Sequence, residues 1–133
     1  MWFRVNPRLP TPIYQQVVDG FKEAIVKGFV KQGDRIPSVR ELATLMTLNH
    51  NTVAKAYQQL EREHVFEIIQ GRGTFVAEFK PPSDSDRDRR LAKIVEMMQQ
   101  IYIEGHYVQL SEDDLMSLFR ETIRKWETGG KDV

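Results

Sequence analysis

The chain has 133 residues, which is enough for one domain or for one small domain with an appendage. It contains no cysteine, so disulfides and thiolate metal sites are excluded. Its net charge is zero, its apolar fraction of 41% is typical of globular proteins, and no apolar run approaches the roughly 18 residues of a membrane span. The first ten residues include arginine and proline, unlike a signal peptide. We therefore expect a soluble, cytoplasmic protein with no membrane partner.

The zero net charge conceals a mild asymmetry. Residues 1–80 hold 11 basic and 8 acidic side chains, whereas residues 81–133 hold 8 basic and 11 acidic ones. The distribution of charge says more about a nucleic-acid partner than the total does. The positive excess lies in the first part of the chain, where the motifs described below occur.

Prolines at positions 7, 10 and 12 predict an extended or irregular start, and Trp2, Phe3 and Val5 are expected to cover the core. A helix is predicted from Pro12 to a C-cap at Gly28. Its buried stripe repeats at three- and four-residue steps: Ile13, Val17, Phe21, Ala24 and Ile25. Residues 29–36 are predicted to form a connection with a turn at positions 33–34.

Two short amphipathic helices follow. Ser38 and Glu41 form a capping-box pattern for the first, which is predicted to stop near position 47, and Asn49 is the N-cap candidate for the second. The inward faces are predicted to hold Val39, Leu42, Ala43 and Met46 in the first helix, and Val53, Ala56, Tyr57 and Leu60 in the second. Helix, tight turn and helix is the pattern of a helix-turn-helix.

The outer face of the second short helix has no carboxylate before Glu61. This face carries His50, Asn51, Thr52, Lys55, Gln58, Gln59 and Arg62. Amides, a hydroxyl, an imidazole and basic groups can hydrogen-bond base edges and phosphates, so the face is predicted to bind DNA. Asn51 is the candidate for bidentate contact with adenine.

A β-hairpin is predicted next, with strands at residues 65–69 and 74–79. The glycines of Gln70-Gly71-Arg72-Gly73 allow a tight tip from which Arg72 projects. In isolation the hairpin could be an ordinary one with a solvated arginine. After a helix-turn-helix it is interpreted as the wing of a winged helix-turn-helix, giving a mainly α fold with a small β-hairpin (α+β).

Residues 81–84 are predicted to be a linker between a DNA-binding domain at 1–80 and a helical segment at 81–133. The segment should hold a long helix that stops at Gly105 and a last helix opened by a Ser111–Asp114 capping box. Its apolar stripes favour homodimerisation, and the alternative is a compact monomer in which they pack on the first domain. The dimerisation candidates are Leu91, Ile94, Val95, Met98, Ile101, Tyr102, Leu115, Leu118, Phe119, Ile123 and Trp126.

Four stretches extend the pattern: PIYQQ at 12–16, GDRIPSVRELA at 33–43, NTVAKAYQQL at 51–60 and GRGTFV at 71–76. In order and spacing they resemble the GntR family of bacterial transcription regulators, and the short helical remainder resembles its YtrA-like subfamily. The resemblance, taken with the outer-face chemistry above, implies a DNA-binding set of Arg35, Ser38, Arg40, Asn49, His50, Asn51, Thr52, Lys55, Gln70, Gly71, Arg72 and Gly73. The chain departs from the family at Asn49-His50-Asn51, where Ser-Arg is usual, and at Glu63-His64, where glycine is usual.

These observations together predict a sequence-specific regulator of transcription. We expect a homodimeric repressor that binds a palindromic operator in double-stranded DNA. The resemblance implies that the regulated operon could encode a transporter. The histidines lie far apart and no triad, metal-ligand spacing or phosphate-binding loop occurs, so we expect no enzyme activity, metal or cofactor. The rival interpretation is a winged helix used for protein or RNA contacts. No effector ligand can be named from the sequence.

Overall fold

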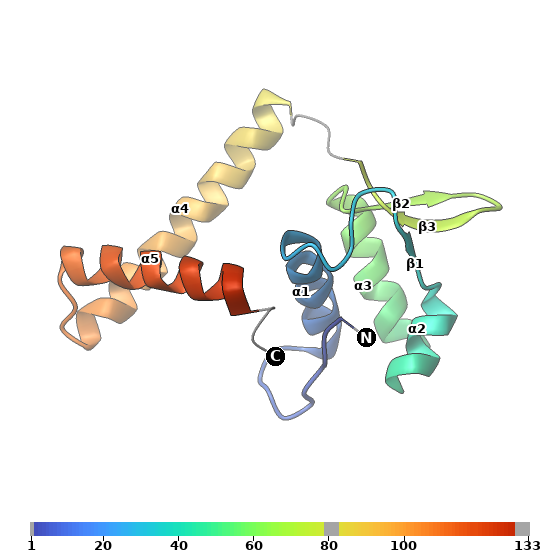
Figure 1. Cartoon of the computed structure of the whole chain (residues 1–133), viewed down its shortest axis with the longest axis horizontal. Coiled ribbons are helices and arrows are strands. Elements are labelled where there is room, and N and C mark those ends of the chain that lie inside the picture. Colours follow the sequence, from blue (N-terminus) through green and yellow to red (C-terminus); the bar gives the residue numbers. More distant parts are fainter. Residues whose placement is uncertain (1, 79–82, 130–133) are drawn as a thin grey trace. The chain divides into compact units, whose positions relative to one another are not determined.

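The computed structural model describes residues 2–78 and 83–129, and the chain divides into two compact units (Figure 1). The first unit is Met1–Phe79 and the second is Lys80–Val133. The predicted linker prolines Pro81 and Pro82, and the end of the last predicted strand at Phe79, lie outside the described residues.

The first unit is a winged helix-turn-helix (Figure 1). Its elements are α1 (Ile13–Val26), β1 (Arg35–Ile36), α2 (Val39–Met46), α3 (His50–Arg62), β2 (Phe66–Ile69) and β3 (Gly73–Val76). The sheet has the order β1-β3-β2 and both pairs are antiparallel. The prediction of a hairpin alone was therefore incomplete, because residues 35–36 form a third strand rather than a plain connection.

The core of the first unit is aromatic at its centre. Phe21 of α1 meets Tyr57 of α3 and Phe66 of β2 edge-on, with ring centroids 5.7 and 5.0 Å apart. Such edge-to-face pairs add about 0.5–1.5 kcal/mol each beyond the burial of the rings. The rings thus hold the first helix against the third helix and the wing, and they fix the direction in which α3 points.

The N-terminal arm contacts α1 through apolar packing and through hydrogen bonds. Phe3 lies over Gly20, with its ring centroid 4.9 Å from that of Phe21, and Val5 also packs against the core. The amide of Gln16 accepts a hydrogen bond from Asn6 N (2.7 Å) and donates to the carbonyl oxygens of Asn6 and Thr11 (3.0 and 2.8 Å). The prediction that the arm covers the core is confirmed for Phe3 and Val5.

Within residues 2–78 and 83–129, four helices end in a left-handed residue, and only the first of these residues is glycine. The positive φ angles are 80° at Gly28, 54° at Thr47, 60° at His64 and 59° at Gln109. In each case the next amide bonds a carbonyl five residues earlier, as Leu48 N does with Ala43 O at 2.9 Å. Glycine adopts this conformation freely, whereas a β-branched threonine does so at a cost. Packing of the flanking residues must therefore impose the turn at Thr47.

The second unit consists of α4 (Asp84–Tyr107) and α5 (Glu112–Gly129). The predicted capping box is confirmed: Ser111 Oγ accepts from Asp114 N at 3.1 Å, and Asp114 accepts from Ser111 N at 2.9 Å. Hydrogen bonding of the Asp114 carboxylate to the backbone amide of Ser111, with a further contribution from the Ser111 side chain, lowers the pKa of Asp114. Within the described residues no helix is long and apolar enough to cross a membrane.

The prediction that α4 stops at Gly105 was wrong. The helix continues to Tyr107 and ends through the left-handed Gln109. Gly105 is buried, and a Cβ there would lie 2.9 Å from Cδ2 of Leu115. Glycine at this position lets α5 approach the backbone of α4, which is a packing role rather than a capping role.

Candidate nucleic-acid interface

The helix-turn-helix is held by hydrogen bonds at its corners. Ser38 Oγ accepts from Glu41 N at 3.1 Å while Glu41 accepts from Ser38 N at 3.3 Å, which completes the predicted capping box. The buried Tyr57 donates its hydroxyl to Pro37 O at 2.6 Å. Burial, assisted by the charge of Glu41, raises the pKa of Tyr57 far above its usual value. The hydroxyl therefore stays protonated and ties α3 to the segment that opens α2.

The beginning of α3 presents polar side chains to solvent. Asn49 caps the helix as predicted, because its Oδ1 accepts from Asn51 N at 2.8 Å. His50 and Asn51 are exposed and Thr52 is half-buried. The cap engages an oxygen of Asn49 but leaves its amide hydrogens able to donate, and Ser38 likewise keeps its hydroxyl hydrogen. All the predicted residues of this corner thus retain a group that can face a ligand.

Farther along α3, some side chains of the outer face already make contacts within the protein. Lys55 is exposed, and its Nζ lies 3.8 Å from the ring centroid of Tyr14 in α1. Gln59 instead donates to Glu63 at 3.1 Å, and Glu63 also pairs with Lys22 at 2.7 Å. The role of Tyr14 could not be predicted from the sequence, because a tyrosine beside an amphipathic stripe gives no sign of which helix it will contact.

The arginines of the wing region lie next to glycines. Arg35 of β1 lies opposite Phe75 of β3, and its guanidinium covers Gly73, where a Cβ would stand 3.3 Å from Arg35 Nε. Gln70, Gly71 and Arg72 are exposed at the tip, and Gly71 has a φ of 77°. The third strand, which the sequence analysis missed, thus brings Arg35 to the wing.

The exposed groups of α2, α3 and the wing belong to one folded unit. Arg40 is exposed at the start of α2, and Ser38 is exposed just before it. α3 carries no carboxylate from His50 to Leu60, and the wing tip at residues 70–73 carries none. The arrangement offers amides, a hydroxyl and cations that can donate hydrogen bonds to an anionic, base-bearing partner.

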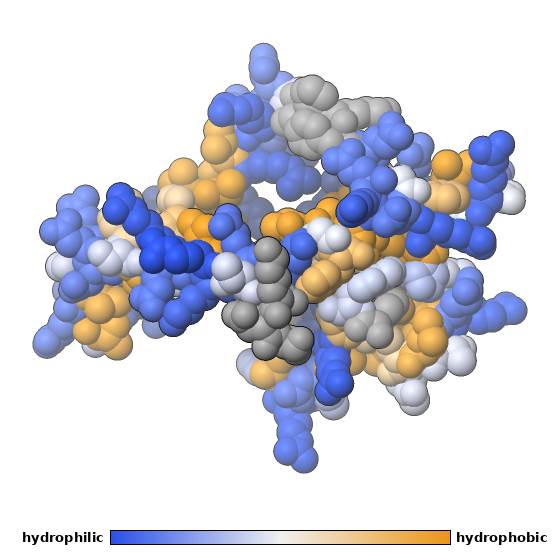
Figure 2. Space-filling model, viewed as in Figure 1, coloured by the Kyte–Doolittle hydropathy of each residue, from blue (hydrophilic) through white to orange (hydrophobic). Residues whose placement is uncertain are grey.

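The second unit leaves its apolar stripes exposed (Figure 2). Along α4 the exposed fractions are 40% for Leu91, 42% for Ile94 and 58% for Ile101, and along α5 they are 51% for Phe119 and 44% for Ile123. The other predicted dimerisation residues are also exposed, except the half-buried Leu115: Val95, Met98, Tyr102, Leu118 and Trp126. Contacts within the second unit therefore do not bury these side chains.

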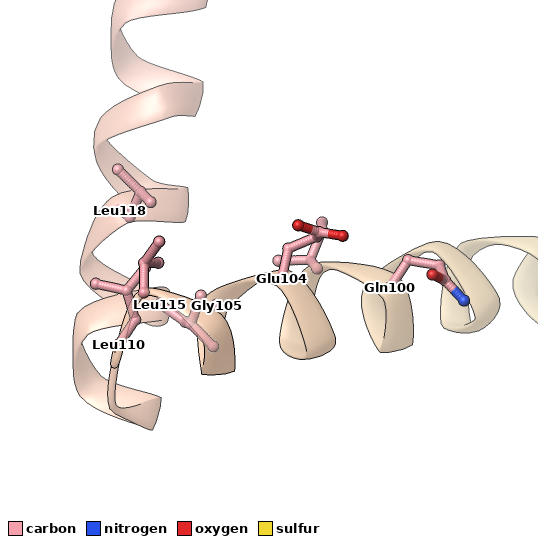
Figure 3. Close-up of a pocket in the computed structure, with 8 residues that line it drawn as sticks. Gln100, Glu104, Gly105, Leu110, Leu115 and Leu118 are labelled. Carbon is pink, nitrogen blue, oxygen red and sulfur yellow. The ribbon is translucent and has the colours of Figure 1, made fainter.

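An open groove of about 410 Å³ lies where α4 and α5 diverge from Gly105 (Figure 3). Leu115 and Leu118 of α5 and Glu104 of α4 are among its lining residues. Among the described residues no group of three or more His, Asp or Glu side chains could hold a metal ion.

The fold and the polar face of α3 define a winged helix-turn-helix domain, a class in which the second helix of the motif enters the major groove of DNA. The sequence model of the family "Bacterial regulatory proteins, gntR family" matches residues 13–76 of this chain. The chain is 40% identical over 118 residues to the HTH-type transcriptional repressor YtrA of Bacillus subtilis, covering 89% of each chain. The chain belongs to the GntR family of DNA-binding transcription regulators and resembles its YtrA-type members.

Two solved structures extend this comparison. A transcriptional antiterminator from Listeria monocytogenes EGD-e superposes with a TM-score of 0.83 at 33% identity, covering 94% of this chain and 92% of that one. The DNA-binding domain of AraR in complex with operator ORX1 has a TM-score of 0.50 at 28% identity, covering 56% of this chain and 93% of that one. Because the match to the Listeria protein covers 94% of this chain, it includes residues of both helices of the second unit.

Proposed function

We propose that this protein is a homodimeric repressor that binds a palindromic operator, with α3 in the major groove and the β2–β3 wing against the neighbouring backbone and minor groove. The observation that carries the proposal is the polar, carboxylate-free face of α3 from His50 to Gln59, beside a wing that carries Arg72 at its tip and Arg35 on its neighbouring strand. Negative charge on this face would repel phosphates, so its absence favours DNA over a protein partner. The family membership supports the same conclusion.

Base reading is assigned to the first turn of α3, because the N-terminal residues of a recognition helix reach the base edges. Asn51 is exposed and its side-chain amide can make a bidentate contact with adenine. Thr52 and His50 flank it and would contact the neighbouring bases or phosphates. Since the family usually places arginine in this corner, His50 should give the protein a base preference different from that of its relatives.

Phosphate contacts are assigned to the basic groups around this turn. Arg40 at the start of α2 and Lys55 on α3 flank the reading residues, while Arg35 and Arg72 belong to the wing. Each phosphate contact adds about 0.9 to the slope of log affinity against log salt. Ser38, Asn49, Gln70, Gly71 and Gly73 would supply the weaker hydrogen bonds and the close backbone approaches.

Dimerisation is assigned to α4 and α5. Soluble monomers rarely expose large contiguous apolar patches, yet both helices expose most of their large apolar side chains. A second copy would cover equivalent faces through a two-fold axis, and two-fold symmetry of the protein requires a palindromic site. The half-sites should then lie about one helical turn, or a multiple of it, apart.

Selection of bound duplexes from a random DNA pool tests the proposal. We expect an inverted repeat, and an RNA duplex of the selected sequence should bind far more weakly. Asn51→Ala should lose about 1–3 kcal/mol of discrimination at one position in each half-site. Gln99→Ala, which removes an exposed amide of α4 outside the proposed DNA contacts, is the control. A loss that is equal on every sequence would contradict base reading by Asn51.

Sedimentation at micromolar concentration tests the dimer. The wild type should sediment as a dimer, and Phe119→Glu on α5 should convert it to a monomer with weaker operator binding. Val26→Glu, placed at a position that is 74% exposed on α1, is the matched control and should remain dimeric. A monomeric wild type would contradict the assignment. Transcript profiling of a deletion strain should show increased expression of a transporter operon, which is what the resemblance to the YtrA-like subfamily implies.

A further inference from the structure

An aromatic contact joins α1 to the middle of α3. Lys55 Nζ lies 3.8 Å from the centroid of the Tyr14 ring, a distance at which the cation is attracted to the face of the ring. We propose that Tyr14 is a positioning residue that holds the Lys55 ammonium in place for a phosphate of the operator backbone. This inference rests on the proposed DNA-binding function and brings the beginning of α1 into the interface.

The Tyr14 ring is suited to be a fixed platform. It is half-buried and packs against the core of the first unit, so its orientation is set by folding rather than by the ligand. Its hydroxyl makes no hydrogen bond within the described part of the chain. The ring face, not the hydroxyl, is therefore the feature that meets another functional group.

The side chain of Lys55 benefits from such a platform. Its stem is long and flexible, and among the described residues no carboxylate pairs with it. A lysine that is free in solution loses much of its rotamer freedom when it binds. Contact with the ring confines the ammonium before DNA arrives, and the three N–H donors still allow one to point at a phosphate.

The position of Lys55 on α3 agrees with this role. It lies four residues after Asn51 and three after Thr52, so the three side chains share one face of the helix. An ammonium one turn beyond the reading residues would meet the strand that borders the major groove. Tyr14 thus acts on register and affinity through Lys55, and it would not itself read a base.

The test compares Tyr14→Phe, which keeps the ring, with Tyr14→Leu, which removes it, on the duplex selected by the wild type. We expect Tyr14→Phe to bind within two-fold of wild type and Tyr14→Leu to bind about two- to five-fold more weakly. Lys55→Met should lower the salt slope by about 0.9. The matched control is Lys93→Met, which removes an exposed lysine of α4 and should leave the slope unchanged.

Two further measurements separate positioning from other roles. In the Lys55→Met background, Tyr14→Leu should cause no additional loss of affinity. In the DNA-free protein, ring-current shifts of the Lys55 side-chain protons should be present in wild type and Tyr14→Phe and absent in Tyr14→Leu. Thermal unfolding of each variant shows whether the fold is retained, and the NMR comparison remains informative if Tyr14→Leu is destabilised.

The outcomes against the inference are distinct from those against DNA binding. Equal losses for Tyr14→Phe and Tyr14→Leu would indicate a hydroxyl–phosphate contact and overturn the positioning role. Additive losses in the double variant would also overturn it, because Tyr14 would then act independently of Lys55. A wild type that selects no duplex at all would instead reject the proposed function, whatever the NMR spectra show.

Discussion

Replacing Gly20 with alanine should destabilise the first unit, although a glycine-to-alanine change inside a helix usually stabilises a protein. Gly20 is buried in α1 beneath the ring of Phe3. A Cβ at position 20 would overlap Cγ and Cδ2 of that ring and lie 2.8 Å from its Cδ1. The ring must therefore move away from α1 and from Phe21, whose centroid is now 4.9 Å away.

The expected magnitude follows from three contributions. Losing the edge-to-face pair with Phe21 costs about 0.5–1.5 kcal/mol. Exposing the half-buried Phe3 costs about 1.5 kcal/mol, the lower end of the range for a buried phenylalanine. The better helix propensity of alanine offsets about 1 kcal/mol. We therefore expect Gly20→Ala to lower the free energy of unfolding by about 1–2 kcal/mol.

The sign of the effect should depend on Phe3. In a Phe3→Ala background there is no ring to displace, so Gly20→Ala should stabilise by about 1 kcal/mol. Urea titrations of the four variants, with Trp126→Phe in every one, would report unfolding through the remaining Trp2, which meets Phe21 edge-on at 6.1 Å. Stabilisation by Gly20→Ala while Phe3 is present would refute the reasoning.

Three further predictions concern the helix ends and the wing. His64→Gly should stabilise the protein by up to about 1 kcal/mol, measured by thermal unfolding, because His64 holds a φ of 60°. Stability should fall above pH 10, the usual pKa of tyrosine, because the unfolded Tyr57 then ionises while the folded one stays neutral; Tyr57→Phe should weaken this fall in alkaline urea titrations. Gly73→Ala should weaken operator binding several-fold in a shift assay, because position 73 has a φ of 124° and a Cβ there would crowd Arg35; unchanged affinity would contradict the role of that arginine at the wing.

The helix-turn-helix could be predicted from the sequence because its signals are local. The capping box at Ser38 and the cap at Asn49 depend on residues three positions apart or fewer, and the structure has both. Strand β1 could not be predicted, since two residues show no alternation and Arg35 pairs with Phe75, forty positions along the chain. Its existence depends on the wing being folded beside it.

Gly105 shows a second limit of the sequence. A glycine near the end of an apolar stripe indicates a helix stop as readily as a close approach of two backbones. Only the position of Leu115 in space distinguishes these roles, and the stop belongs instead to Gln109. The contact between Tyr14 and Lys55 is hidden for the same reason, because it joins two helices whose packing angle no local pattern encodes.

The left-handed threonine between α2 and α3 has a consequence for the order of folding. Local preference opposes this turn, so we expect it to form only after the flanking residues Met46 and Leu48 have packed against the core. Thr47→Gly should then slow unfolding and change the refolding rate little, since the strain at this corner arises after the rate-limiting step. The turn that orients the recognition helix would be among the last parts of the unit to close.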